Sequence, residues 1–487
     1  MKKINKLITY ILTVGVLSSC SDFLKKDPLT VTNSGKFFTN EAEANRVLIG
    51  CYNALKQPII SNGPNQSGNF LMWEALSDNA LNSSNYESFD VVMRGEHTPS
   101  TGGIVEKTWN ILFSGVGDCN YFLANLDKVP DLAQDKKDKM KAEALFLRAY
   151  YYNELTQLYG DLPIRLTPAT LTEELKQPRS PKSVVVDQIL KDVDFAIANL
   201  PKTAYTNGRP VQGSAIVLKT RVLLNNEKFK TAAETAWSLI GSPANPFALH
   251  NNYAGIFFKE QDNNKEIMFS VQFKAPNDYH SLDQIVGSRM AVFPTVELLN
   301  AYEPNDPRRL MTILEPGQPW AYNPAGFQRQ GSKAESPIPF NDLAFKKWVN
   351  LNEANASGAT LSDQHMVKIR YADLLLMYAE AMFEDGQGAD PRALKALNDV
   401  RTRPGVNMPE KTSLTRDIIR NERRVELAFE GLRYNDLIRW ETAEQIIPTL
   451  IHNSANAKRK FKSYYFPVPL KQMDIMKGIW DQNPGWQ

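Results

Sequence analysis

The sequence predicts a mainly α-helical protein of several tetratricopeptide-like helix pairs, with large irregular loops and little β structure. Three observations predict this class. Long segments in both halves of the chain place apolar residues three or four positions apart, the spacing of one helix face. Small residues at the expected helix crossings allow close approach, as in paired antiparallel helices. Two stretches rich in Gly, Pro, Asn and Ser interrupt the helices and are too long for simple connections.

The first 19 residues predict an export signal. Three lysines precede an apolar core, Leu7 to Leu17, that is too short to cross a bilayer. The following "LSSC" matches a bacterial lipobox, so we expect cleavage before Cys20 and attachment of acyl chains, palmitate among them, to that cysteine. Acyl chains of this kind hold a protein to a membrane surface. The alternative is an ordinary signal peptide with a chance cysteine.

The first half of the mature chain predicts a series of helices. "NEAEANRVLIGCYNALKQP" begins at Asn40, a suitable N-cap, and stops at Pro58. The segment 105–130 follows, and its glycines are expected to loosen its middle. The strongest pattern is "DKKDKMKAEALFLRAYYYNELTQLYGDLP", which is apolar around much of its circumference and therefore buried between other helices. Further helices are expected near 183–199, 212–225 and 227–240.

The second half predicts one strand and a helical hairpin. "KEIMFSVQF", residues 265–273, is a β-branched and aromatic run typical of a strand. The pair of helices at 370–403 turns at Gly386 and Gly388, and its second helix begins with Asp390 as N-cap and Pro391 at the first position. Two loop regions, 59–103 and 303–362, lie between the helices, and loops of this length are usually functional.

Charge and cysteine content narrow the classes of partner. The formal charge of the chain is +2, and removal of the signal with its three lysines changes it to +2 − 3 = −1. A nucleic-acid partner would require a strong basic excess and is not expected. Cys51 and Cys119 remain after Cys20, and both lie in apolar helical stretches. Buried free thiols are therefore favoured, and a disulfide between the two cysteines stays open as the alternative.

Segments along almost the whole mature chain resemble the SusD/RagB family, the nutrient-binding outer-membrane lipoproteins of Bacteroidota. The resemblance rests on "CSDFLKKDP", "AEALFLRAYYYNELTQLYGDLPI", "EIMFSVQF", "IRYADLLLMYAEA", "ERRVELAFEGLRYNDLIRW" and "YYFPVPLKQMDIMKGIWDQNPGW", in this order. It implies an α-superhelical scaffold of about four tetratricopeptide-like helix pairs, with an irregular remainder that contacts the ligand. It also implies a partner, a SusC-like TonB-dependent barrel, over which the protein acts as a lid.

Both loop regions hold the residue types that bind sugars. A sugar ring has apolar faces edged with hydroxyl groups, so its binders combine aromatic planes with polar side chains. The resemblance points to these loops, and the candidate ligand contacts are Trp73, Asp78, Asn79, Tyr86, Trp320, Tyr322 and Arg329. Trp73 fits the core equally well, and Asp78 suits a role in positioning its loop. Trp348, in "AFKKWVNL", is assigned to the core.

No enzyme is predicted. The five histidines are scattered, and HExxH, GxSxG and phosphate-binding glycine motifs are missing from the sequence. Glu422, Glu426 and Glu430 repeat every four residues beside Arg423 and Arg433, which predicts a solvated or inter-helix ion-pair face. No metal site or cofactor is predicted, although a structural calcium ion held by loop oxygens stays open.

Together with the lipobox, the resemblance therefore implies a cell-surface lipoprotein of the outer membrane that captures oligosaccharide or polysaccharide for a TonB-dependent transporter. Two alternatives stay open: a lid that captures peptides, and a glycoside hydrolase with two facing carboxylates. The expected organisation is a signal peptide at 1–19, an N-terminal region at 20–264 and a C-terminal region at 265–487.

Overall fold

The computed structural model describes residues 38–61, 69–82, 85–168, 176–280, 282, 292–318, 343–349, 361–452 and 457–486. Helices account for most of these residues, as predicted. The α-helices are α2 (Glu41–Gly50), α3 (Phe89–Met93), α4 (Ile104–Asn125), α5 (Gln134–Tyr159), α6 (Lys182–Asn199), α7 (Gln212–Leu224), α8 (Phe229–Ile240), α9 (Val296–Leu299), α10 (Pro307–Thr312), α11 (Tyr371–Met382), α12 (Pro391–Thr402), α13 (Arg416–Leu427), α14 (Arg433–Arg439), α15 (Ala443–Ile446) and α16 (Leu470–Ile475).

Short 3₁₀ segments and one π-helical turn complete the helical part of the fold. The 3₁₀ segments are η2 (Asn53–Lys56), η3 (Asn69–Leu76), η4 (Tyr86–Ser88), η5 (Leu126–Lys128), η7 (Ala254–Phe257), η8 (Lys259–Gln261) and η11 (Ile447–Thr449). The π-helical turn, η10 (Phe383–Gln387), directly extends α11. Two of these segments, η3 and η4, lie inside the region 59–103, whose described residues are therefore less irregular than the sequence predicted.

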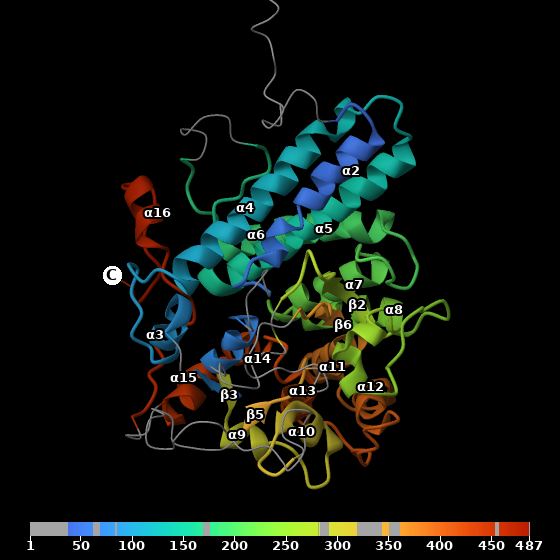
Figure 1. Cartoon of the computed structure of the whole chain (residues 1–487), viewed down its shortest axis with the longest axis vertical. Helices are drawn as coiled ribbons and strands as arrows, with labels where there is room; N and C mark the ends of the chain where they lie inside the picture. Colours follow the sequence, from blue (N-terminus) through green and yellow to red (C-terminus); the bar gives the residue numbers. More distant parts are fainter. Residues whose placement is uncertain are drawn as a thin grey trace, which may run out of the picture.

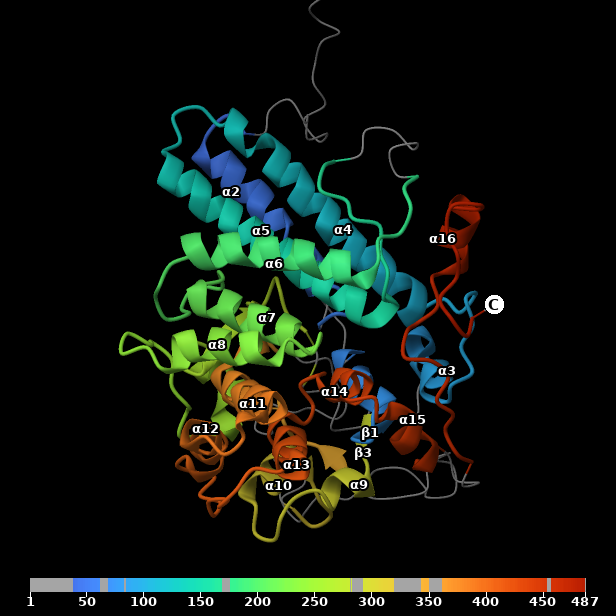
Figure 2. The same ribbon diagram turned by 180° about the vertical axis from the view of Figure 1, so that it is seen from behind.

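The long helices form a stack in which consecutive helices pack side by side. α4 packs on α5, α5 on α6, α6 on α7, α7 on α8, α8 on α11, and α11 on both α12 and α13. Figure 1 and Figure 2 show this stack from its two sides, with α4, α5 and α6 at one end and α11 to α13 toward the other. The prediction of tetratricopeptide-like helix pairs in a mainly helical scaffold is confirmed.

The helix α5 is buried along most of its length, as its pattern predicted. Its tyrosines fix it to the neighbouring helices: Tyr151 donates a hydrogen bond to the Cys51 carbonyl oxygen at 2.6 Å, and Tyr159 donates to that of Val105 at 2.6 Å. The expectation that glycines loosen the facing helix α4 is wrong. α4 is continuous, and a Cβ at Gly115 would lie 2.6 Å from Cε2 of Tyr151. Gly115 permits close packing of the two helices.

Helix starts that depend on local sequence are formed as predicted. Asn40 accepts a hydrogen bond from the backbone N–H of Glu43 at 3.0 Å and caps α2. Asp390 caps α12 in the same way, with Pro391 at the first helical position. Gly386 has a φ of 76°, which a residue without Cβ adopts freely. The hairpin from α11 to α12 is therefore specified by its turn.

The described strands form three small antiparallel pairs. β1 (Ala80–Asn82) pairs with β3 (Val292–Pro294), so that Leu81 lies opposite Phe293. β2 (Ile267–Val271) pairs with β6 (Met366–Arg370), and β4 (Ile313–Leu314) pairs with β5 (Ala344–Phe345). The strand predicted within 265–273 is thereby confirmed as β2. The pair of β2 and β6 contacts the helical stack through α7 and α11.

One continuous hydrophobic core runs through the described residues, from α2 to the C-terminal segment. Cys51 and Cys119 are buried in it as free thiols, as the sequence favoured. The chain end is fixed by Trp486, whose indole N–H donates to the Tyr465 carbonyl oxygen at 2.9 Å. None of the helices in the described ranges combines the length and the apolar character that crossing a membrane requires.

Candidate functional site

The two predicted loop regions, 59–103 and 303–362, lie next to each other. β1 belongs to the first region and pairs with β3, and β3 contacts β5, which belongs to the second. Figure 1 shows β3 and β5 close together, beside the lower end of the helical stack. Ligand residues contributed by both regions can therefore act in one site.

The bases of the two regions are joined through aromatic rings. The ring of Phe70 packs edge-on against that of Trp348, with ring centroids 5.6 Å apart. Trp348 also packs on Phe257 at 4.6 Å, and its indole N–H donates to the Phe429 carbonyl oxygen at 2.8 Å. Trp348 is buried, as predicted, and its φ of 77° is a left-handed conformation that a tryptophan rarely adopts. This cluster fixes the bases of both regions to the core.

Trp73 and Tyr86 are the predicted aromatic contacts that the structure describes. Both are half-buried against the hydrophobic core. The indole N–H of Trp73 donates to the Ile59 carbonyl oxygen at 2.8 Å, and its ring packs edge-on against Phe89. Trp73 therefore has a packing role. That either ring stacks on a ligand stays a prediction.

Asp78 and Asn79 are buried, and their polar atoms contact other residues of the protein. Asp78 accepts two hydrogen bonds from Arg433, at 2.8 and 3.0 Å, and Arg424 donates to Asn79 Oδ1 at 2.9 Å. Burial by itself raises the pKa of Asp78, but the Arg433 and Arg424 guanidinium groups outweigh it and hold that pKa below its usual value. These contacts tie the first loop region to α13 and α14. That they also contact a ligand stays a prediction.

The remaining predicted residues lie outside the described part of the chain. These are Cys20, Trp320, Tyr322 and Arg329. The second region is described on both sides of the last three, up to Gln318 and again from Leu343. Its flanks are held together by β4 and β5 and by Lys346, whose ammonium donates to the Leu310 carbonyl oxygen at 3.0 Å.

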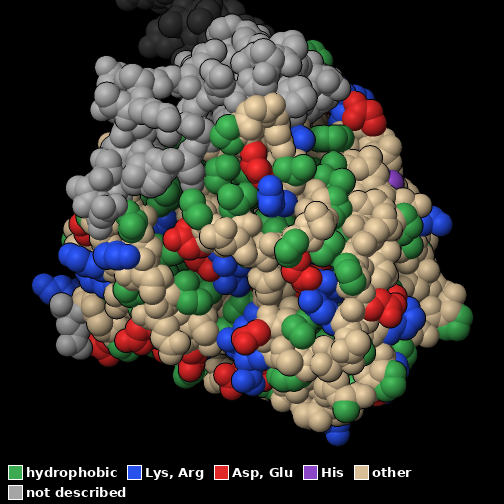
Figure 3. Space-filling view, turned by 90° about the horizontal axis from the view of Figure 1, so that it is seen from below, with side chains coloured by type: hydrophobic (Ala, Val, Ile, Leu, Met, Phe, Trp, Pro, Cys, Tyr) green, Lys and Arg blue, Asp and Glu red, His purple; other side chains and the backbone are tan. Residues whose placement is uncertain are grey.

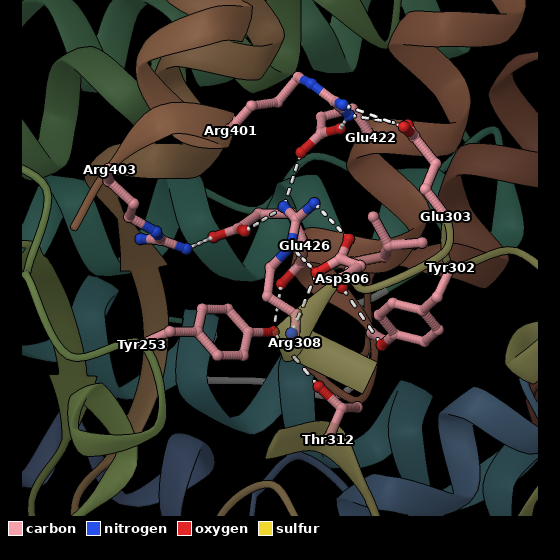
Figure 4. A network of polar contacts seen from close by, with 12 residues as sticks. Tyr253, Tyr302, Glu303, Asp306, Arg308, Thr312, Arg401, Arg403, Glu422 and Glu426 are labelled. Carbon is pink, nitrogen blue, oxygen red and sulfur yellow. Dashed lines mark hydrogen bonds and ion pairs between the residues drawn. The ribbon is translucent and has the colours of Figure 1, made fainter. Parts of the chain in front are cut away.

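A buried network of charges anchors the second region to the C-terminal helices (Figure 4). Arg308 of α10 donates to Glu422 at 2.6 Å and to Glu426 at 2.9 Å. Arg370 and Arg403 also contact the Glu426 carboxylate. Burial raises the pKa of Glu426, but these three guanidinium groups reverse that effect and hold it well below its usual value. Glu426 is therefore ionised and fully paired inside the protein.

The prediction of an ion-pair face at Glu422, Glu426 and Glu430 is confirmed in part and corrected in part. The acidic ladder was expected to be solvated or to join helices, and it joins helices in the interior, where Glu422 and Glu426 are buried. The neighbouring arginine was expected to pair with it, but Arg423 instead pairs with Asp373 at 2.9 Å and with Asp436. Arg423 and Glu426 are three positions apart but do not pair, because Arg423 faces α11 and α14 whereas Glu426 faces Arg308 of α10.

Lys347 supports the same anchor and was not identified from the sequence. Its ammonium donates to the carbonyl oxygens of Glu426 and Ala428, at 3.2 and 2.9 Å, and pairs with Glu430 at 2.6 Å. These acceptors lie at the C-terminal end of α13, where the helix dipole favours a cation. Burial lowers the pKa of Lys347 to about 8, against the attraction of Glu430. Two adjacent lysines before a tryptophan give no sequence signal for this role.

A polar cavity lies between the helical stack and the base of the first region. It is lined by residues of α4, α5, α7, α14 and β6 and by Phe70 and Trp73, and it holds about 80 Å³ of space, enough for a few water molecules. Thr108 Oγ1 and Asn153 Oδ1 line it, are buried and have no hydrogen-bond partner among the described residues.

The described residues contain no group of three or more His, Cys, Asp or Glu side chains that would hold a metal ion. On the face seen in Figure 3, acidic and basic side chains are interspersed, and hydrophobic side chains are scattered between them. No single sign of charge dominates this face, and the attraction it would exert on a polyanion is correspondingly weak.

Comparison with known proteins gives consistent matches. The family model described as "SusD family" matches residues 295–486, and the one described as "Starch-binding associating with outer membrane" matches residues 23–224. Among curated proteins, "SusD-like protein P25" of Formosa agariphila is 24% identical and covers 97% of this chain and 97% of its own length. A "SusD-like protein" of Bacteroides ovatus is 22% identical, over 90% of this chain and 82% of its own.

Solved structures share the fold. A SusD-like carbohydrate binding protein from Bacteroides fragilis superposes with a TM-score of 0.79 at 24% identity, covering 93% of this chain and 100% of its own. A laminarin binding SusD-like protein gives a TM-score of 0.76 at 23% identity, over 92% and 100%. The surface glycan-binding protein A from Bacteroides thetaiotaomicron gives 0.75 at 20% identity, over 92% and 100%. The overall fold is thus shared with these structures.

Proposed function

Because the chain belongs to the SusD family, we propose that it is a carbohydrate-binding lipoprotein of the outer-membrane surface. It captures oligosaccharide or polysaccharide and delivers it, as a lid, to a partner SusC-like TonB-dependent transporter. The proposal assigns no reaction to the protein. We also propose that residues 20–264 and 265–487 form its two regions, which is supported by family matches on either side of this division.

The carbohydrate ligand is supported by the relatives. One family model is described as starch-binding, and one structural neighbour binds laminarin. These two polysaccharides are therefore the first probes to use. The same family description, "associating with outer membrane", supports the location. Cys20 would supply the lipid anchor for that location.

The single observation that carries the site assignment is the contact between the bases of the two loop regions. Phe70 and Trp348 join regions that are 278 positions apart, so aromatic residues of both regions can face one ligand. A polysaccharide consists of successive sugar rings, and binding several of them requires several aromatic side chains on which they can stack. We propose Trp73, Tyr86, Trp320, Tyr322 and Arg329 as contacts. Asp78 and Asn79 would act by holding the first region in place.

Affinity electrophoresis tests the proposal directly. The purified protein is run through gels that contain laminarin, starch or one of a panel of other polysaccharides. Retardation by at least one of them supports carbohydrate capture. Unchanged mobility throughout the panel, together with binding to peptides in solution, would replace the proposed ligand class with peptides.

A further inference from the structure

The Lys368 side chain lies where two parts of the first loop region meet. It projects from the middle of β6, and its ammonium donates a hydrogen bond to the Ile60 carbonyl oxygen at 2.6 Å. The same ammonium lies 5.7 Å from the centre of the Phe70 ring, close enough for a cation–π attraction. One charged group thereby contacts Ile60 and Phe70, ten positions apart at the start of this region.

A second contact closes the same segment. The indole N–H of Trp73 donates to the carbonyl oxygen of Ile59, the neighbour of the residue that Lys368 binds. Residues 59–60 are thus held to residues 70–73 at two successive carbonyl groups. We call these two contacts, Lys368 with Ile60 and Phe70 and Trp73 with Ile59, the loop clasp.

The Lys368 ammonium forms no ion pair with a described carboxylate. Within the described part of the chain, no carboxylate lies within 4.0 Å of its ammonium. Glu154 faces it across the cavity and accepts a hydrogen bond from Asn153 at 3.3 Å. Burial lowers the pKa of Lys368 to about 8, with Glu154 opposing and Arg221 assisting this shift. The group therefore stays largely protonated at neutral pH.

An unpaired buried ammonium is costly unless its hydrogens and its charge are satisfied. Here the surface that protein does not cover faces the polar cavity, and the covered part contacts one carbonyl oxygen and one aromatic ring. Apolar side chains of similar length would fill this space at a lower desolvation cost. A lysine at this position is explained by its two loop contacts. The hydrogen bond to Ile60 needs a donor, and the attraction to the Phe70 ring needs a positive charge.

We propose that Lys368 is a positioning residue for the ligand site: through the loop clasp, it holds the start of the first loop region against the scaffold. The inference rests on the proposed function, because it assumes that this region contacts the ligand. Phe70 extends the effect to the second region through Trp348. In this proposal Lys368 acts through Ile60 and Phe70 and not by direct contact with the ligand.

The test compares three variants of the full chain. Lys368→Met keeps the length of the side chain but removes its positive charge and its hydrogen-bond donors. Lys368→Arg keeps the positive charge and the donors. Lys395→Met is the matched control, because Lys395 lies on α12 with a side chain that is 71% exposed. Hydrogen exchange read by mass spectrometry reports the clasp in peptides that span residues 57–61 and 69–76. Affinity for laminarin and starch reports the site, and a melting curve reports overall stability.

The inference predicts that Lys368→Met raises exchange in these two peptides at least fivefold and weakens binding about tenfold. Exchange in α8 and α12 stays as in the unchanged protein, and Lys368→Arg restores more than half of the lost affinity. Faster exchange with an affinity within twofold of the unchanged protein would reduce Lys368 to a purely structural contact and overturn the inference. Unchanged exchange would overturn the clasp itself. If the unchanged protein binds neither probe while Lys368→Met still raises exchange, the proposed function fails and the clasp survives as a structural contact only.

Discussion

The ring of Phe70 packs edge-on against the ring of Trp348, with centroids 5.6 Å apart and planes at 86°. Phe70 belongs to the first loop region, 59–103, and Trp348 to the second, 303–362. Edge-on aromatic pairs contribute about 0.5–1.5 kcal/mol beyond their burial. This contact makes the two regions one structural unit, and it is the basis of the proposed single site.

Gly115→Ala is expected to destabilise the protein. The added Cβ would lie 2.6 Å from Tyr151 and 2.8 Å from the Ala54 Cβ, and such overpacking costs about 1–3 kcal/mol. Urea unfolding monitored by circular dichroism measures the loss.

The matched control is Gly117→Ala, two residues further along α4. No atom lies within 4 Å of a Cβ at this position, so the substitution is expected to stabilise the helix by up to about 1 kcal/mol. Equal effects of the two substitutions would show that Gly115 does not mark close packing.

Glu426→Gln is expected to lower the free energy of unfolding by about 3–5 kcal/mol. The substitution removes the carboxylate charge that Arg308, Arg370 and Arg403 share, so that this buried group of cations loses one of its countercharges. Chemical unfolding at pH 7 measures the effect. Glu410→Gln, at an exposed position, serves as the control and should change stability by less than about 0.5 kcal/mol. A loss below about 1 kcal/mol for Glu426→Gln would contradict the role given to the network.

Glu74 is expected to make stability depend on pH. Burial raises the pKa of Glu74 to about 7, against hydrogen bonds from Asn79 and Gly431. The folded state therefore binds more protons than the unfolded state between about pH 4.3 and pH 7, and the contribution of Glu74 to stability falls as the pH rises through this range.

The comparison with Glu74→Gln isolates this contribution. The difference in unfolding free energy, unchanged protein minus variant, is expected to be about 2–3 kcal/mol more favourable to the unchanged protein at pH 5 than at pH 8. Other titrating groups are common to both proteins and cancel. A difference that is constant with pH would show that Glu74 titrates normally.

Cys20→Ser is expected to release the protein from membranes. The substitution removes the thiol that would carry the acyl chains, and with it the anchoring that several chains provide. Detergent partitioning of cell fractions, with labelled palmitate as a second readout, measures the change. Cys51→Ala is the control, since Cys51 is a buried free thiol. A membrane-bound, labelled Cys20→Ser protein would place the lipid elsewhere.

Trp320→Ala is expected to weaken carbohydrate binding by about 1–3 kcal/mol, the scale of a lost aromatic contact. Trp237→Ala is the comparison, because Trp237 stacks on Tyr378 within the scaffold, at 5.2 Å between ring centroids. That variant should lose stability and keep its affinity. An unchanged affinity for Trp320→Ala would remove this residue from the site.

The sequence predicted those features of the fold that depend on neighbours in the chain. The Asn40 cap, the Asp390–Pro391 helix start and the Gly386 turn are local, and all are formed. Burial of α5 followed from its periodicity, and Trp348 was correctly assigned to the core.

The features that were missed depend on contacts between distant residues. Arg308 and Glu426 are 118 positions apart, and Lys368 and Ile60 are 308 apart. A charged residue in a helical pattern shows the same periodicity whether its partner is a neighbour or a residue in another element. For this reason the Glu422 ladder was assigned the nearby Arg423 and Arg433 as partners, and Lys347 and Lys368 were not identified.

Calorimetric titration of the purified protein with laminarin, starch and a peptide mixture tests the central claim most directly. The account predicts saturable binding of at least one carbohydrate and no saturable binding of the peptides. Saturable binding of the peptides alone would contradict this claim. So would the absence of saturable binding to laminarin, starch, the peptides and every other polysaccharide of the panel.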